Sequence, residues 1–284
     1  MDGTPPGVDL GGTIALVTGA SRGVGRGVAH ELGAAGATVY VTGRSTADDR
    51  TDDLEGTVEG TAGLVTEAGG TGIGVVCDHT DDSAVAALFD RIESDHGGLD
   101  LLVNCAWGGY EGHDGTFDDP FWIQPTGRWD RMFDAGVRAA FVASQRAAGP
   151  MLERGSGLLV NVSSGDDGKF RGSVPYDVAK TAVDRMTAGM AHELREYGVS
   201  AVGLYPGFTR TERVEAAFDR PEEVPAGTES PRFSGRAVAA LAADGDVMAR
   251  SGGVFKTGEL ARDYGFTDVD GTTPDPFEFE GERL

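Results

Sequence analysis

The stretch TIALVTGASRGVG (residues 13–25) joins a short apolar run to a glycine-rich turn. The run at 13–18 is typical of a buried strand, and a helix is predicted to follow at 23–35, ended by Gly36. A turn of this kind lets the backbone present N–H groups to a phosphate at the helix N-terminus, so the order of elements predicts an α/β unit that binds a nucleotide. The glycines of the turn are Gly19, Gly23 and Gly25.

The rest of the chain alternates short apolar runs with longer amphipathic stretches, which is typical of a parallel sheet covered by helices on both faces. We therefore predict a single α/β domain over residues 1–284, a Rossmann-type doubly wound parallel sheet of about seven strands. The other strands are expected at 37–42, 73–77, 99–104, 158–162, 199–205 and 253–257. The other helices are expected at 82–94, 129–148, 174–197 and 236–243.

Four segments lack a clear period. We expect residues 1–12 to be a disordered lead-in and 260–284 an irregular tail. The acidic, proline-containing segment 207–232 is a candidate substrate lid, and 106–126 is expected to be a long loop beside the active site. Five aromatic side chains of that loop are candidates for an apolar pocket wall, with core packing or an oligomer interface as the alternatives: Trp107, Tyr110, Phe117, Phe121 and Trp122.

The charge balance is strongly acidic, with 46 acids, 24 bases and a net charge of -22. Such a field repels phosphate backbones and excludes nucleic acid as a natural partner. The acids are spread along the chain and lysine occurs only at 169, 180 and 256, a pattern that favours a halophilic host over an acidic docking surface.

Other compositional signals indicate a cytoplasmic protein. The two cysteines, Cys77 and Cys105, follow predicted strands and are expected to be reduced. No apolar run is long enough to span a membrane, and the first 12 residues lack the features of a signal peptide. The five histidines show no paired metal-ligand spacing, so no metal is assigned.

The residues after the second strand indicate which nicotinamide cofactor the turn would hold. NAD-binding versions of this turn end the second strand with an acidic residue, but here Gly43 stands there, followed by Arg44. A second cation, Arg22, lies within the glycine turn. Two guanidiniums near one ribose suit a 2′-phosphate, so NADP(H) is predicted over NAD(H), the alternative being two solvated arginines.

Tyr176 and Lys180 are four residues apart, so they share one face of the predicted helix. Six tyrosines and three lysines in this length predict only about 0.06 such pairs by chance. A nearby cation lowers the pKa of a phenol, which suits it to acid–base catalysis on a carbonyl. A hydroxyl to orient the substrate would come from Ser163 or Ser164, although serine at a strand end is also ordinary turn chemistry.

Five motifs in order resemble the short-chain dehydrogenase/reductases over residues 12–260: TGASRGVG (18–25), VNCA (103–106), NVSS (161–164), YDVAK (176–180) and PGFTRT (206–211). The resemblance implies Tyr176 as catalytic acid–base, Lys180 as the residue that lowers its pKa, and Ser164 as the residue that orients the substrate. It also implies contacts of Asp78 with adenine and of Thr211 with the carboxamide. The implied cofactor residues are Gly19, Ser21, Arg22, Gly23, Val24, Gly25, Arg44, Asp78, Asn104, Ala106, Tyr176, Lys180, Pro206, Gly207 and Thr211.

The chain departs from the family pattern at two places. The strand-end motif Asn-Asn-Ala-Gly is here Asn-Cys-Ala-Trp, and the asparagine expected after Trp129-Asp130 is Gly136. Glycine keeps the backbone carbonyl that helps to hold a water beside the lysine, but lacks the side chain. Further stretches, FWIQP (121–125), HELREYGVS (192–200) and LARDYGFTDVDG (260–271), resemble the animal subgroup called dehydrogenase/reductase member one, which also has this glycine.

The resemblance implies an NADP(H)-dependent oxidoreductase of the carbonyl reductase type, which acts on a bulky apolar carbonyl or alcohol. It also implies a homodimer or homotetramer formed through the helices at 129–148 and 175–197. Two alternatives use the same fold: a non-catalytic NADP-binding regulatory protein, and a dehydratase or epimerase that uses the same tyrosine. No membrane partner is expected.

Overall fold

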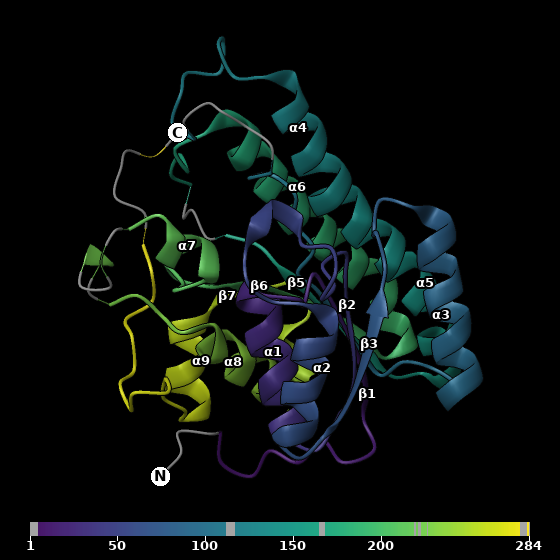
Figure 1. The fold of residues 1–284 in the computed structure, drawn as a ribbon. Coiled ribbons are helices and arrows are strands. Elements are labelled where there is room, and N and C mark those ends of the chain that lie inside the picture. The colour runs from purple at the N-terminus through teal and green to yellow at the C-terminus, as the bar shows by residue number, and fades with distance from the viewer. Residues whose placement is uncertain are drawn as a thin grey trace.

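A computed structural model describes residues 5–111, 117–164, 168–218, 220, 223–225, 227–278 and 283. Seven parallel strands form one sheet in the order β3-β2-β1-β4-β5-β6-β7 (Figure 1). The predicted doubly wound parallel sheet is therefore confirmed. The strands are β1 (Ile14–Thr18), β2 (Thr38–Gly43), β3 (Thr71–Val76), β4 (Leu101–Asn104), β5 (Gly157–Val162), β6 (Val199–Tyr205) and β7 (Val254–Lys256).

Helices cover both faces of this sheet. One layer contains α1 (Gly23–Ala34), α2 (Val58–Glu67), α8 (Pro231–Ala243) and α9 (Thr257–Tyr264), and the other contains α3 (Asp82–His96), α5 (Ala139–Arg154) and α6 (Val174–Leu194) (Figure 1). Successive side chains of a strand point to opposite faces. In β1, Val17 accordingly packs into the core beneath α1 and α8, whereas Leu16 packs into the core beneath α3 and α5. Both side chains are fully buried.

The strand order reverses its direction at β1, which lies between β2 and β4. The last residue of β1, Thr18, is in register with Asn104, the last residue of β4. Ligands of open α/β sheets bind where the strand order reverses, outside the carboxyl ends of the strands. The sheet therefore brings the glycine turn after β1 and the loops after β4, β5 and β6 to one edge.

The segment from 126 to 154 differs from the single predicted helix at 129–148. It begins as α4 (Thr126–Met132), passes through a π-helical turn at Phe133–Arg138 and continues as α5. A π-helical turn inserts an extra residue into the helical hydrogen-bond pattern, and such turns occur often at functional sites. The apolar period of the sequence does not reveal it.

Other predicted boundaries also need correction. The tail is not irregular throughout, because α9 extends to Tyr264 and buries Leu260 and Ala261 in the core. The lead-in is not wholly disordered: Leu10 is buried, and its N–H donates to the Ala35 carbonyl at 2.7 Å. The segment 207–232 contains the short helix α7 (Glu212–Ala216), and α8 begins at Pro231, five residues before the predicted start. None of the helices in the described ranges is long and apolar enough to cross a bilayer.

Candidate active site

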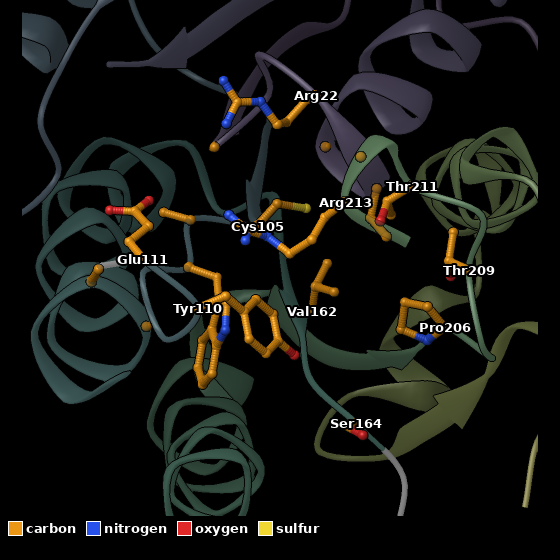
Figure 2. A pocket seen from close by; sticks show the side chains of 18 of the residues that line it. Arg22, Cys105, Tyr110, Glu111, Val162, Ser164, Pro206, Thr209, Thr211 and Arg213 are labelled. Atoms are coloured by element: carbon orange, nitrogen blue, oxygen red, sulfur yellow. The ribbon is translucent and has the colours of Figure 1, made fainter. Parts of the chain in front are cut away.

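A cavity of about 950 Å³ opens at the carboxyl ends of the strands. Figure 2 shows it between the loop that carries Tyr110 and Glu111 and the segment that carries Pro206, Thr209 and Thr211. Every site residue predicted from the sequence lines this one cavity: Gly19, Ser21, Arg22, Gly23, Val24, Gly25, Arg44, Asp78, Asn104, Ala106, Ser164, Tyr176, Lys180, Pro206, Gly207 and Thr211.

The glycine turn packs tightly against the loop after β4. Gly19 has a φ of +63°, and a Cβ added there would lie 2.7 Å from the Cα of Ala106. The Thr18 hydroxyl accepts hydrogen bonds from the backbone N–H groups of Cys105 and Ala106, both at 3.1 Å. Only glycine suits position 19, because any side chain would collide with the neighbouring backbone.

A carboxylate lies at the N-terminus of α1, where the sequence predicts a phosphate. The first backbone N–H of α1, that of Gly23, donates to Glu212 Oε2 at 2.7 Å, and Arg26 pairs with Glu212 Oε1 at 3.0 Å. Helix N-termini attract anions because their N–H groups are unpaired and the helix dipole is positive there. The Glu212 carboxylate therefore satisfies the positive end of α1 in this structure.

The two arginines expected near a ribose phosphate both line the cavity, and both have protein partners. Arg44 forms an ion pair with Glu111, in which Nη2 donates to both carboxylate oxygens, at 2.5 and 2.6 Å. Arg22 donates to the Ser45 hydroxyl at 2.7 Å and to the Thr51 carbonyl at 3.0 Å. Arg22 therefore organises the loop after β2, whereas Arg44 joins that loop to the loop after β4.

Tyr176 stands in the first turn of α6, directly after Pro175. Its hydroxyl is hydrogen-bonded with those of Ser164 and Tyr110. Burial raises the pKa of Tyr176, while these two hydrogen bonds and the charge of Arg171 oppose that rise. Tyr176 is therefore protonated at neutral pH and can donate a proton.

Lys180 is on the same face of α6, one turn later, and is 8% exposed. Its ammonium lies 4.2 Å from the centroid of the Trp107 ring and 5.7 Å from that of Tyr176, and it donates to the Val162 carbonyl at 3.4 Å. Burial lowers the pKa of Lys180 to about 8, against the opposing charge of Asp184. The amine is therefore mostly protonated at neutral pH.

The two candidate serines have different partners. The Ser163 hydroxyl donates to the Lys180 carbonyl at 3.2 Å and so ties the end of β5 to α6. The Ser164 hydroxyl meets the Tyr176 hydroxyl at the cavity. The geometry thus separates two residues that the sequence leaves equivalent.

A buried ionic cluster beneath Tyr176 has no counterpart in the sequence predictions. The Arg171 side chain is completely buried and donates to Asp177 Oδ1 at 3.3 Å and to Asp184 Oδ2 at 3.2 Å. The Tyr205 hydroxyl donates to the same Asp184 oxygen at 2.7 Å. Only the spacing of Asp184 from Lys180, four residues along α6, gives a sequence signal for this cluster.

Three further predicted residues have polar partners near the cavity. Asn104 donates to Asn161 Oδ1 at 2.8 Å and to the Ser144 hydroxyl at 3.0 Å, which links β4, β5 and α5. Asp78 accepts from the Thr80 hydroxyl at 2.8 Å. Thr211 is the N-cap residue of α7, because its hydroxyl accepts from the Val214 N–H at 3.3 Å.

Three of the five candidate aromatic residues form one wall of the cavity. Trp107, Tyr110 and Phe117 line it and contact the Tyr176 ring or one another. Phe121 and Trp122 do not line it and are 62% and 72% exposed. The loop after β4 therefore places an apolar surface beside the Tyr176 hydroxyl.

Comparisons with known proteins agree with this geometry. The family model described as short chain dehydrogenase matches residues 13–222. Dehydrogenase/reductase SDR family member 1 of Mus musculus is 41% identical over 272 residues, which cover 92% of this chain and 84% of the mouse protein. The protein of that name in Homo sapiens is 38% identical, covering 92% and 85%. A crystal structure of a short chain dehydrogenase from Mycobacterium thermoresistibile superposes with a TM-score of 0.81 at 25% identity, covering 97% of this chain and 96% of that one.

Proposed function

The chain belongs to the short-chain dehydrogenase/reductase family, and from this premise we propose that it is an NADP(H)-dependent carbonyl reductase. The proposed reaction transfers hydride between C4 of the nicotinamide and a carbonyl carbon. One observation carries the proposal: the hydroxyls of Tyr176 and Ser164 and the ammonium of Lys180 meet in the cavity that the glycine turn also lines.

The residues present fit a dinucleotide. The N-terminus of α1 already holds an anionic group, the Glu212 carboxylate, at the position where the turn would present its amides to a pyrophosphate. Asp78 and Thr211 line the same cavity, beside β3 and before α7, where the family resemblance expects contacts with the adenine and the carboxamide. When bound, the cofactor supplies or accepts the hydride.

Arg44 supports the preference for NADP(H). Its guanidinium already pairs with an anionic group at the cavity, and a guanidinium suits the binding of a 2′-phosphate. Gly43 leaves no acid at the end of β2 to hold a ribose hydroxyl. In this account Glu111 releases Arg44 when the phosphate arrives.

Tyr176 is proposed as the acid–base residue. In the reductive direction its hydroxyl donates a proton to the oxygen that becomes an alkoxide as the carbonyl carbon accepts hydride. Ser164 donates a hydrogen bond to the same oxygen, and the Lys180 ammonium stabilises the tyrosinate that remains. Each of these groups lines the cavity, so the proton passes directly between the substrate oxygen and Tyr176.

The wall formed by Trp107, Tyr110 and Phe117 supports a bulky, apolar substrate. Phe208 and Phe277 line the cavity from the segment before α7 and from the tail, and add to the apolar surface. Ketones with ring systems or long apolar chains would bury that surface, which favours their binding. The segment 207–232, which contains α7, is the proposed substrate lid.

The proposal is tested by cofactor oxidation with a panel of bulky ketones and aldehydes. NADPH and NADH are each supplied in molar KCl and in low salt. We expect NADPH to be used at the lower KM, and Arg44→Ala to raise the KM for NADPH at least about tenfold while changing that for NADH little. Tight NADPH binding without reduction of any carbonyl would instead support the non-catalytic alternative.

A further inference from the structure

The π-helical turn between α4 and α5 brings the backbone of Gly136 against the indole of Trp107. A Cβ added at Gly136 would lie 2.6 Å from both Cε3 and Cζ3 of that ring. Contacts this short cannot be accommodated without moving the indole or the helix. The two departures from the family pattern, a tryptophan after β4 and a glycine in the following helix, are therefore one structural feature: the indole occupies the space that the glycine leaves.

The same indole covers the Lys180 ammonium. Nζ lies 4.2 Å from the centroid of the Trp107 ring, well within the range of a cation–π contact. The ring also meets Tyr176 edge to face, with centroids 5.5 Å apart and planes at 85°. Trp107 is thus in direct contact with both members of the proposed catalytic pair.

The Trp107 indole contacts Lys180 through its ring face and not through its N–H group. Its Nε1–H is buried and makes no hydrogen bond within the part of the chain that the structure describes. A buried indole N–H normally has a hydrogen-bond acceptor. The position of Trp107 is therefore explained by the packing of its ring and not by a hydrogen bond of its N–H group. The ring contacts Gly136, the Lys180 ammonium at its face, and the aromatic rings of Tyr176 and Tyr110.

We infer that Trp107 is a positioning residue, which keeps the Lys180 ammonium charged and next to Tyr176, and that Gly136 provides the space this indole needs. The inference rests on the proposed function, because Tyr176 and Lys180 are the proposed catalytic pair. Burial disfavours the charged amine, and the electron-rich ring face offsets part of that cost. The other titratable groups that face Lys180 are Asp184 and Tyr176 on α6, Arg171 before it and Cys105 after β4.

The chain's scarcity of lysine allows a direct test. Its three lysines, Lys169, Lys180 and Lys256, give a resolvable NMR spectrum when the protein is made with ¹³C-labelled lysine. Lys180 is assigned from a Lys180→Arg sample and titrated with pH. We expect ring-current-shifted Lys180 signals in the wild type, and in Trp107→Leu the loss of that shift together with a pKa lower by about one unit.

Matched variants separate the aromatic face from general packing. Trp107→Phe keeps a ring and is expected to lie between wild type and Trp107→Leu. Trp129→Leu removes an indole that stacks on Phe133 outside the cavity, and should leave the Lys180 titration unchanged. An unchanged Lys180 pKa in Trp107→Leu would overturn the inference, as would an equal shift in Trp129→Leu.

Gly136 is tested by Gly136→Ala beside Gly149→Ala on α5, where an added Cβ meets nothing within 4 Å. Gly136→Ala should displace the indole, abolish the ring-current shift and lower kcat about tenfold, with the alkaline limb of the pH profile moved to lower pH. In a Trp107→Leu background, Gly136→Ala should cause little further loss of kcat. Gly149→Ala should have the kcat and the Lys180 titration of wild type. Additive losses would contradict the shared role of the pair.

The NMR titration of Lys180 tests the role of Trp107, and the kinetics of carbonyl reduction test the proposed function, so either can fail alone. Wild-type protein without turnover, but with a shifted Lys180 that depends on Trp107, would refute the reductase proposal and leave the contact established. Turnover with a Lys180 titration and pH profile insensitive to Trp107 would refute the inference alone.

Discussion

Two adjacent serines at the end of β5 have separate partners. Ser163 ties the strand to the backbone of α6, and Ser164 meets the hydroxyl of Tyr176 in the cavity. Both serines line the cavity, but only Ser164 is hydrogen-bonded with Tyr176. The proposed substrate contact therefore belongs to Ser164.

Ser164→Ala is expected to lower kcat about 100-fold with folding intact, since it removes the hydroxyl beside Tyr176. Ser163→Ala removes a buried hydroxyl that is hydrogen-bonded with the Lys180 carbonyl and with Asp184, and should cost about 1 kcal/mol of unfolding free energy, with kcat changed less than about threefold. Steady-state kinetics and chemical denaturation of both variants check this. The reverse pattern would place the substrate hydroxyl on Ser163.

Residues of the site could be predicted from the sequence where their spacing on a helix allows only one arrangement. Tyr176 and Lys180 lie four residues apart on a predicted helix, and the structure places both on the cavity. Arg171 could not be predicted from the sequence, because it precedes α6 in irregular backbone and meets Asp184 only after the chain folds. The contact between Trp107 and Gly136 could not be predicted either, because the two residues are 29 positions apart in the sequence.

At the scale of elements, α7 occupies the mouth of the cavity. Glu212 in its first turn holds the N-terminus of α1, and Arg213 pairs with Asp52 in the loop after β2. These ion pairs bring the proposed lid against the proposed phosphate site. A bound pyrophosphate and the Glu212 carboxylate would compete for the same N–H groups.

Glu212→Gln is expected to lower the Kd for NADPH several-fold, because it removes a negative charge that competes with the cofactor phosphates. The matched control is Glu215→Gln, an exposed residue of the same helix, which should change the Kd little. Fluorescence titration of NADPH measures both. Weaker binding by Glu212→Gln would show that this carboxylate supports the bound state.

The order of strands and helices was predictable because each strand is a compact apolar run and each crossover helix has its own apolar stripe. The exceptions have physical reasons. The helix α2 (Val58–Glu67) contains Gly60 and Gly63, which weaken its helical signal, yet it buries Val58 and Val65 against the sheet. The buried face of α9 rests on Leu260 and Ala261, too few apolar residues to show a period.

At the scale of the whole molecule, charge is the dominant property. The net charge of -22 produces strong self-repulsion at low ionic strength. Exposed apolar side chains on α4, α5 and α6, among them Trp129, Phe141 and Val178, lie where we expect copies of the chain to meet in a dimer or tetramer. The fold class could be predicted from the period of apolar residues. The formation of a dimer or tetramer could not, because it depends on the shape and composition of the folded surface.

The Tm is expected to rise when KCl increases from about 0.05 M to about 2 M, since the screening length falls to a few ångströms and the repulsion weakens. Differential scanning fluorimetry in KCl, with sucrose of equal osmolality as the uncharged control, measures this. A Tm that is independent of KCl would contradict the prediction of a protein adapted to high salt.

The pH dependence of stability is expected to include a contribution from Glu229. Burial raises its pKa from 4.5 to about 7, with the N–H of Gly207 donating to it at 2.9 Å. Between pH 4.5 and about 7, Glu229 binds a proton in the folded chain and releases it in the unfolded chain. Its contribution to the free energy of unfolding therefore falls as the pH rises through this range. Glu229→Gln should therefore gain stability relative to wild type across that window, measured by urea denaturation. A constant difference across that pH range would contradict this.

If Tyr176 transfers the proton in an NADPH-dependent reduction, Tyr176→Phe should lose turnover and keep cofactor binding. NADPH binding by fluorescence titration and carbonyl reduction are measured on the same preparation of wild type and variant. We expect the variant to bind NADPH with a Kd within about threefold of wild type, while kcat falls at least about 1000-fold. A variant that keeps its turnover would contradict the claim.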